Sequence, residues 1–264
     1  KTGQEIWKTK AGQGSHSSPV VLDGKVVAVM GPLVALDAQS GAKLWERNDV
    51  AGANTSPAVW RDGEKPLLLC NGGKLACIDP ADGKVLWQAP GGGESTPAIC
   101  GNIAAVLTTS HADGAPGLLV YRLARTGATS LASAQSFAQG ASPIIDADRV
   151  YAVGENKAVC VGLADGKQLW ESTSLTETWS SPILVGKTLL ACCSKQLVLV
   201  DTSGPEPTII SKGPLEMADC TSPALAGGLL YIRGPPSLRC YGPRPPQTPP
   251  CSPLHCTPLP HRTN

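Results

Sequence analysis

Aromatic residues are scarce in this 264-residue chain: Phe, Trp and Tyr together make up 4% of it, and Phe occurs once. No run of about 18 apolar residues is present, so the sequence predicts no membrane-spanning helix. The 22 Lys and Arg residues nearly balance the 21 Asp and Glu residues. Domains that bind nucleic acid or anionic membranes usually carry a basic patch, so this balance argues against both as partners.

The cysteines lack the spacing of common cofactor or disulfide motifs. No Cys-x-x-Cys-His sequence occurs, which argues against covalently attached haem. Of the ten cysteines, Cys77, Cys160 and Cys240 share one position of the repeat described below, and Cys70 and Cys192 share another. Free Cys behaves as a small hydrophobic residue. We therefore expect small, inward-facing core positions rather than a disulfide framework, and we expect no metal site.

The chain does contain a repeated segment, first complete at Ala35–Trp45. In this copy an Asp is followed by Gly four positions later, and the Gly is followed by Trp after four more. The copy at Cys77–Trp87 matches position for position, whereas the copy ending at Trp170 has Gly162 in place of Asp. We interpret these as structural repeat residues: Trp7, Asp37, Gly41, Trp45, Asp79, Gly83, Trp87, Gly166 and Trp170.

The repeated residues predict a β-hairpin with a buried tryptophan. Asp accepts hydrogen bonds from backbone N–H groups of a turn, and Gly takes the position with positive φ. The Trp lies on the second strand, where its ring can be buried against the neighbouring sheet while the indole N–H keeps a polar partner. Stacked modules bury a shared surface at a regular interval. We therefore interpret the tryptophans as packing residues between repeats.

A second signal, Ser-Pro or Thr-Pro, sets the length of the repeat. These prolines are separated by 38, 40, 46, 39 and 41 residues, and they are Pro19, Pro57, Pro97, Pro143, Pro182 and Pro223. A period near 40 residues with four short apolar strands per unit is typical of a β-propeller blade. We therefore predict an all-β fold, a β-propeller of four-stranded antiparallel blades with about six repeat units in residues 1–241.

The two ends of the repeat region are complementary. The sixth unit has predicted strands at Ala224–Ala226, Leu229–Arg233 and Leu238–Tyr241 but lacks a fourth, whereas Gln4–Lys8 has the sequence of a fourth strand without a blade. Addition of that strand to the last unit would close a six-bladed ring and remove exposed sheet edges. A parent ring of seven or eight blades is the alternative.

The chain begins at Lys1, without Met and inside a repeat, so we expect a fragment or a processed product. No signal segment is present in it. Residues 242–264 are rich in proline, and we predict that they form a disordered tail. An altered reading frame is a second explanation for this abrupt change of composition.

The pattern Ala-x-Asp-x-x-Ser/Thr-Gly-x-x-x-Trp resembles the tryptophan-docking repeat of the PQQ-like, or quinoprotein alcohol dehydrogenase-like, β-propellers. The resemblance covers residues 1–241 and implies a bacterial protein. Two functional classes share this repeat: dehydrogenases that hold pyrroloquinoline quinone (PQQ) and calcium, and non-catalytic BamB-like propellers that bind other proteins. Fold resemblance alone does not choose between the classes.

The dehydrogenase alternative rests on the adjacent residues Cys192 and Cys193, because several PQQ-dependent alcohol dehydrogenases carry a vicinal disulfide beside the cofactor. In this sequence the pair occupies ordinary strand positions. An enzyme would also need a general base and irregular carboxylates that ligate calcium, and the regular Asp37, Asp79 and Asp201 are expected at turns. We therefore expect no catalytic residues and no cofactor; PQQ and calcium belong only to the dehydrogenase alternative.

The favoured interpretation is an extracytoplasmic, monomeric scaffold that binds a protein or peptide partner, with BamB-like function implied by the resemblance. A sensor or substrate-binding propeller of a larger multidomain protein is a further alternative. Binding residues usually lie on variable loops of a rigid frame. In each unit the residue three positions before the repeat Pro is expected to ring one mouth of the propeller, and we propose His16, Asn54, Glu94 and Trp179, with Cys220 equivalent to them. The outer rim is expected at Asn71–Lys74, Ser110–Gly117 and Glu155–Lys157.

Overall fold

The computed structural model describes residues 2–52, 54–109, 117–177, 179–217 and 221–242. These residues contain 23 β-strands and no helix. The prediction of an all-β propeller is confirmed: five sheets have four antiparallel strands in chain order, and the sixth has three. The predicted tail, apart from Gly242, lies outside the described residues. So do residues 110–116 of the predicted outer rim.

We call each sheet a blade and number the blades in chain order. The first three blades are formed by β1 Val20–Leu22, β2 Lys25–Val29, β3 Gly31–Asp37 and β4 Lys43–Gly52; β5 Ala58–Trp60, β6 Leu67–Cys70, β7 Leu75–Ile78 and β8 Val85–Ala89; and β9 Ala98–Cys100, β10 Ile103–Leu107, β11 Leu118–Ala124 and β12 Gly127–Ala134. The last three blades are formed by β13 Ile144–Ile145, β14 Arg149–Val153, β15 Ala158–Gly162 and β16 Gln168–Ser172; β17 Ile183–Val185, β18 Thr188–Cys193, β19 Gln196–Asp201 and β20 Thr208–Pro214; and β21 Ala224–Ala226, β22 Leu229–Arg233 and β23 Leu238–Tyr241.

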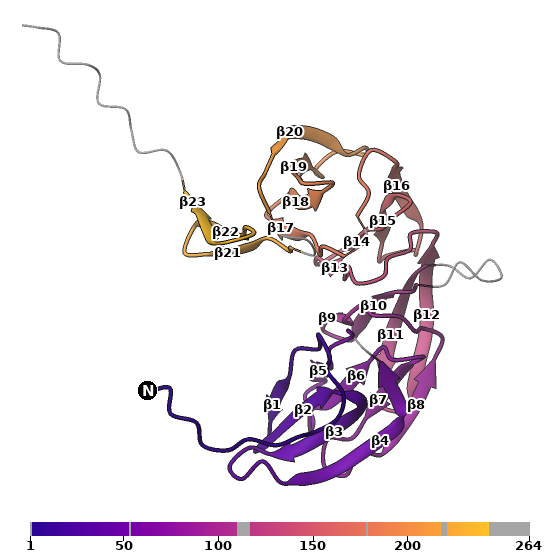
Figure 1. Cartoon of the computed structure of the whole chain (residues 1–264). Coiled ribbons are helices and arrows are strands. Elements are labelled where there is room, and N and C mark those ends of the chain that lie inside the picture. The colour runs from indigo at the N-terminus through magenta and orange to yellow at the C-terminus, as the bar shows by residue number, and fades with distance from the viewer. Residues whose placement is uncertain (1, 53, 110–116, 178, 218–220, 243–264) are drawn as a thin grey trace, which may run out of the picture.

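The blades follow one another along an arc, with the first strand of each blade on the inner side and the fourth on the outer side (Figure 1). The arc remains open between β21–β23 and β1 (Figure 1). Each of the five successive pairs of blades encloses one apolar cluster. The core of the protein is therefore divided among the blade boundaries, as expected when neighbouring repeats bury a shared surface.

A β-bulge recurs between the third and fourth strands of all five four-stranded blades. In the first blade, Ala35 pairs with Trp45 and Leu36 pairs with Lys43, so Leu44 is the extra residue. A bulge leaves one residue outside the ladder, and Leu44 is 48% exposed. The same register leaves Leu86 and Leu169 exposed in later blades.

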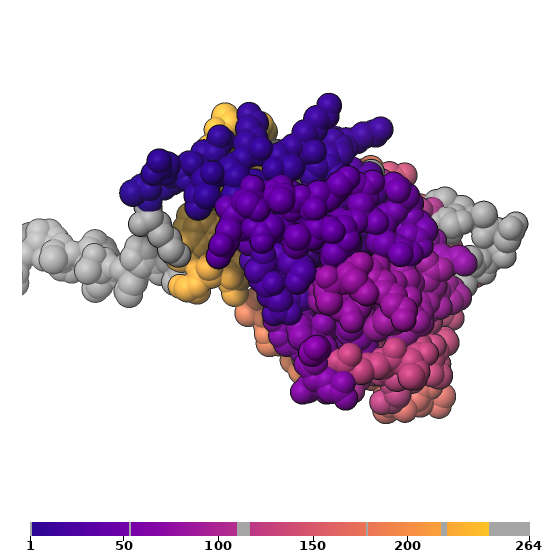
Figure 2. All heavy atoms as spheres, turned by 90° about the horizontal axis from the view of Figure 1, so that it is seen from below, coloured from indigo at the N-terminus to yellow at the C-terminus, as the bar shows by residue number. Residues whose placement is uncertain are grey.

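The expected strand at Gln4–Lys8 is not formed. This segment has no strand pairing, and in the space-filling view the indigo N-terminal residues lie along the violet surface of the first blades (Figure 2). The indole N–H of Trp7 nevertheless donates to the carbonyl of Ala38 at 3.0 Å. A strand needs a neighbouring edge to complete its backbone hydrogen bonds, and β23, the complementary edge, lies across the opening of the arc (Figure 1).

One cysteine departs from the expected core position. Cys77 and Cys160 are buried, but Cys240 is exposed, although it occupies the equivalent position on its third strand. In the described residues β23 has no fourth strand beside it. The burial of this repeat position therefore depends on the strand and blade that pack over it.

Candidate partner-binding mouth

The residues before the repeat prolines form a chain of hydrogen bonds that crosses five blade boundaries. At each boundary, the backbone N–H of one Ser or Thr donates to the hydroxyl of the equivalent residue in the next blade. The five bonds are Ser18 to Ser56 at 2.9 Å, Ser56 to Thr96 at 3.3 Å, Thr96 to Ser142 at 3.1 Å, Ser142 to Ser181 at 2.9 Å and Ser181 to Ser222 at 2.9 Å. We call this chain the hydroxyl belt.

A second row of hydroxyl residues, one position earlier, supports the belt. Thr55 donates to the carbonyl of Ser95 at 3.0 Å, and Ser180 donates to the carbonyl of Thr221 at 2.6 Å. All four residues are buried. Their hydroxyls satisfy backbone carbonyls that would otherwise be buried without partners. The sequence carries a signal for this row, because a Ser or Thr precedes most of the Ser-Pro and Thr-Pro pairs.

The belt brings the proposed mouth residues of neighbouring blades together. Asn54 and Glu94 are each two positions before a belt residue, and the side-chain amide of Asn54 donates directly to the carboxylate of Glu94. Both residues are half-buried. The equivalent residue of the fourth blade is Gly140, which the sequence analysis left out. A Cβ at Gly140 would lie 2.7 Å from Cε3 of Trp179, so the indole packs on its backbone.

Trp179 is 39% exposed despite this packing. Its backbone N–H donates to the Glu177 carboxylate at 3.1 Å, which fixes the segment before β17. A large aromatic ring that is braced on one side and accessible on the other is the kind of side chain that dominates protein interfaces. The mouth therefore has one aromatic anchor and, on the second and third blades, one polar pair.

The structure brings together only part of the predicted mouth. His16 is exposed, and its side chain makes no hydrogen bond or ion pair within the part of the chain that is described. Cys220 lies outside the described residues. The contacts that are present join Asn54 to Glu94 and Gly140 to Trp179.

The predicted rim needs a correction at Asn71, which is fully buried. Its side-chain NH₂ group donates to the backbone carbonyls of Ser95 and Leu107, at 3.4 and 3.3 Å. Its side-chain oxygen Oδ1 accepts the backbone N–H of Gly92 at 2.9 Å. Asn71 is thus a structural link between the second and third blades. The sequence placed it on the rim because a polar residue beside Gly suggests an exposed turn.

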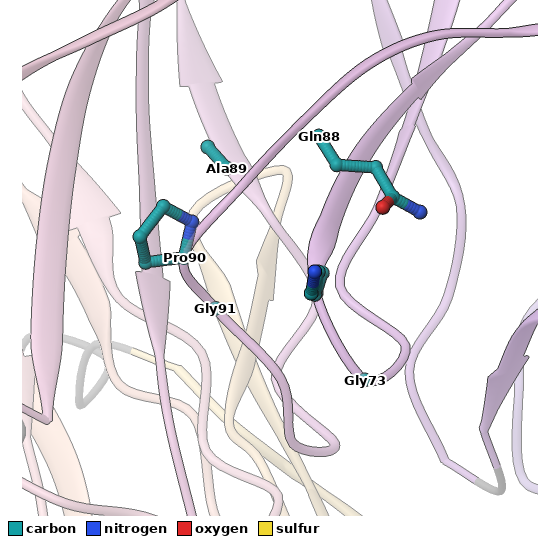
Figure 3. A pocket seen from close by; sticks show the side chains of 6 residues that line it. Gly73, Gln88, Ala89, Pro90 and Gly91 are labelled. Atoms are coloured by element: carbon teal, nitrogen blue, oxygen red, sulfur yellow. The ribbon is translucent and has the colours of Figure 1, made fainter.

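Gly73 and Lys74, which follow Asn71, are exposed and line a pocket of about 420 Å³. Figure 3 shows Pro90 and Gly91 on one side of this pocket and Gly73 on the other. On the fourth blade, Lys157 of the predicted rim pairs with Glu171 at 2.6 Å. Residues 110–116 of the rim lie outside the described residues, and Gly72 and Gly117, which the prediction also placed on the rim, are buried.

The repeated tryptophans contact the hairpin of the following blade. Trp45 donates to the carbonyl of Pro80 at 3.1 Å, and Trp87 donates to that of Ala124 at 3.0 Å. A Cβ at Gly83 would lie 2.7 Å from the ring of Trp45, so only Gly permits this close approach. Trp170 differs: it is buried, but its ring nitrogen has no partner among the described residues.

In the next hairpin the corresponding carbonyl has another donor. The carbonyl equivalent to that of Pro80 belongs to Thr202, and it accepts the guanidinium of Arg149 at 3.0 Å. In the third blade Leu131 replaces Trp, and a Cβ at Gly166 would lie 2.3 Å from the backbone carbonyl of Leu131. At this boundary the repeat glycine therefore makes room for a backbone carbonyl, whereas Gly83 makes room for an indole ring.

The repeated Asp residues act as turn residues. The Asp37 carboxylate accepts the N–H of Gln39 at 3.1 Å and both the N–H and the hydroxyl of Ser40 at 2.8 Å. The Ser40 hydroxyl and these N–H groups lower the pKa of Asp37. Asp79 likewise accepts the N–H of Ala81 at 2.8 Å. These carboxylates are committed to their turns.

Cys192 and Cys193 pack on opposite faces of β18 and are free thiols. Cys192 contacts a cluster with Met217 and Ile232, whereas Cys193 belongs to the cluster that contains Trp170. Burial raises the pKa of Cys192 to about 11 and that of Cys193 to about 12. The pair does not form the vicinal disulfide on which the dehydrogenase alternative rested. Among the described residues, no three His, Cys, Asp or Glu side chains gather as a metal site requires.

The family model of the outer membrane protein assembly factor BamB matches residues 1–111 and 91–236. The structure is similar to that of BamB from Moraxella catarrhalis, with a TM-score of 0.73 and 18% identity over 89% of this chain and 71% of that chain. It is also similar to the computationally designed Ika8 protein, with a TM-score of 0.69 and 10% identity over 91% of this chain and 74% of that chain. No curated protein sequence matches the chain.

Proposed function

The chain belongs to the family of the outer membrane protein assembly factor BamB, and on this premise we propose that it is a non-catalytic scaffold that binds another protein. The observation that carries the proposal is the position of Trp179, whose ring is braced by Gly140 and 39% exposed at the mouth. Trp at the centre of an interface commonly contributes about 2 kcal/mol or more of binding energy. The partner is a protein or peptide segment.

The family name supports a location outside the cytoplasm and a role in the assembly of outer membrane proteins. From this family membership we propose that the chain lies outside the cytoplasm. Within the described residues, no helix has the length and apolar character needed to cross a membrane. The partner we propose is therefore another component of outer-membrane protein assembly, or an outer membrane protein that is being assembled.

The rigid frame supports a binding role for the mouth. The hydroxyl belt and the buried Asn71 hold the segments that carry Asn54, Glu94 and Trp179 in a defined arrangement before any partner arrives. A site that is already ordered loses less conformational entropy on binding. The mouth therefore binds as a preformed surface.

Affinity capture from a cell-envelope extract tests the proposal. We compare the wild-type chain, a double variant with Trp179→Ala and Glu94→Ala, and Leu169→Ala. Leu169 is a matched control because it is 43% exposed, similar to the 39% of Trp179, but lies at the β-bulge of a fourth strand. We expect the wild type and the control to recover the same assembly component, and the double variant to lose it. Equal recovery by all three proteins would refute the proposal.

A further inference from the structure

A groove of about 700 Å³ lies between the fifth and sixth blades. It is lined by the turn between β18 and β19, the segment that follows β20, and the sixth blade, with Lys195, Leu215, Glu216, Met217, Arg239 and Tyr241 among its residues. The apolar cluster at this boundary has only Cys192, Met217 and Ile232 as its buried residues. The two blades therefore meet over a small core and leave the groove beside it.

Lys195 lies in the tight hairpin turn between β18 and β19. Cys193 pairs with Gln196, so Ser194 and Lys195 are the two loop residues, and their φ values of +49° and +61° are those that a type I′ turn requires. In the second blade the turn between the second and third strands has Gly73 at φ +75°, followed by Lys74. Both turns thus present a lysine just before the third strand.

The charges in the groove are unevenly paired. The Arg239 guanidinium donates to the carboxylate of Glu216. Lys195 is exposed and makes no ion pair with any described residue. Among the described residues that line the groove, its ammonium is thus the charge without an ion-pair partner.

The remaining lining is apolar. Leu215 is half-buried, Met217 is buried at the floor and Tyr241 is 37% exposed. Met and aromatic side chains adapt well to apolar peptide residues. The backbone N–H of Leu215 donates to the carbonyl of Lys195 at 2.9 Å, so the ammonium-bearing residue and the apolar wall are fixed to each other.

We propose that this groove binds an acidic, apolar segment of a partner protein, with a carboxylate at Lys195 and an apolar side chain against Leu215 and Met217. None of the residues that line the groove is one of the proposed mouth residues His16, Asn54, Glu94 and Trp179, so the proposal does not depend on the proposed function. The C-terminal residues 243–264 of the chain contain no Asp or Glu. The chain itself therefore does not supply the acidic side chain from that segment.

Fluorescence anisotropy with the full chain tests the proposal. The probes are labelled octapeptides in which one Asp or Glu is flanked by Leu or Phe, together with matched peptides that carry Asn or Gln. We expect the acidic peptides to bind at least tenfold more tightly than their amide counterparts. Equal affinities, or no binding of the acidic peptides, would overturn the proposal.

Four variants separate the groove from general charge and from folding. Lys195→Gly should weaken binding at least tenfold, while its Tm should be no lower than that of the wild type because Gly accepts φ +61°. Lys195→Arg should retain binding. Lys74→Ala, at the equivalent turn, should also retain it, and so should Leu169→Ala. A loss with Lys74→Ala as large as that with Lys195→Gly would show unspecific attraction and would contradict the assignment.

Discussion

The hydroxyl oxygen of Ser56 accepts the backbone N–H of Ser18 at 2.9 Å, across the boundary between the first two blades. The same bond recurs at the later boundaries, so each blade fixes the position of the next one along the belt. At two of these boundaries the residues two positions before the belt residues contact each other, Asn54 with Glu94 and Gly140 with Trp179.

We predict that Ser56→Ala and Ser142→Ala each lower the free energy of unfolding by about 1 kcal/mol, since each removes one hydrogen bond and leaves a backbone N–H without its acceptor. Urea denaturation measures the change. Ser133→Ala, at an exposed position of β12, is the control and should differ from the wild type by less than about 0.5 kcal/mol. Identical midpoints for all three variants would show that the belt contributes no stability.

Removal of Trp87 should be more costly. Trp87 is 8% exposed and packs between the second and third blades, so Trp87→Ala should destabilise the protein by about 3–5 kcal/mol. Trp7→Ala should cost about 1–2 kcal/mol because its ring is only half-buried and less apolar area is lost. Thermal unfolding of the two variants checks this order. A larger loss for Trp7 would contradict the packing described here.

Thiol labelling should divide the cysteines by burial. Cys100 and Cys240 are exposed, whereas burial raises the pKa of Cys77 and of Cys160 to about 12. Because the thiolate is the reactive form, iodoacetamide at pH 8 should modify Cys100 and Cys240 within minutes and spare the buried pair until the protein unfolds. Peptide mapping by mass spectrometry identifies the labelled sites. Rapid labelling of Cys77 in the native protein would contradict its buried position in the second blade.

Gly140→Ala should disturb the mouth without removing any side chain from it. The new methyl group would lie 2.7 Å from the Trp179 ring, which must move. We expect the tryptophan fluorescence to change and partner capture to fall, while Gly127→Ala should alter neither, because a Cβ at Gly127 meets no atom within 4 Å. If Gly140→Ala captured the partner as well as the wild type does, the position of the Trp179 ring would not matter for binding, which would contradict the proposed mouth.

The sequence was sufficient to predict the repeating fold. The spacing of the prolines gave the blade length, and the Asp-to-Gly turn gave the hairpin between the third and fourth strands. The strands of the sixth blade, Ala224–Ala226, Leu229–Arg233 and Leu238–Tyr241, have the predicted bounds. These features are local, because turn chemistry and strand alternation are set within a few residues.

The features that the sequence did not predict depend on a neighbouring blade. Gln4–Lys8 has a strand sequence but no adjacent edge in this structure. The burial of Asn71 follows from carbonyls of the third blade. The Trp170 indole has no partner among the described residues, and the equivalent carbonyl, that of Thr202, accepts Arg149. Contacts across a blade boundary join residues about 40 positions apart, and a single repeat does not reveal them.

Photo-crosslinking from the mouth tests the central claim most directly. A photoreactive phenylalanine analogue is placed at Trp179 in one protein and at Leu169 in another, because the two positions are 39% and 43% exposed. After irradiation in a cell-envelope extract, the account predicts a discrete adduct with one outer-membrane assembly component from position 179 and none from position 169. The same adduct from both positions, or from position 169 alone, would contradict a partner site at the mouth.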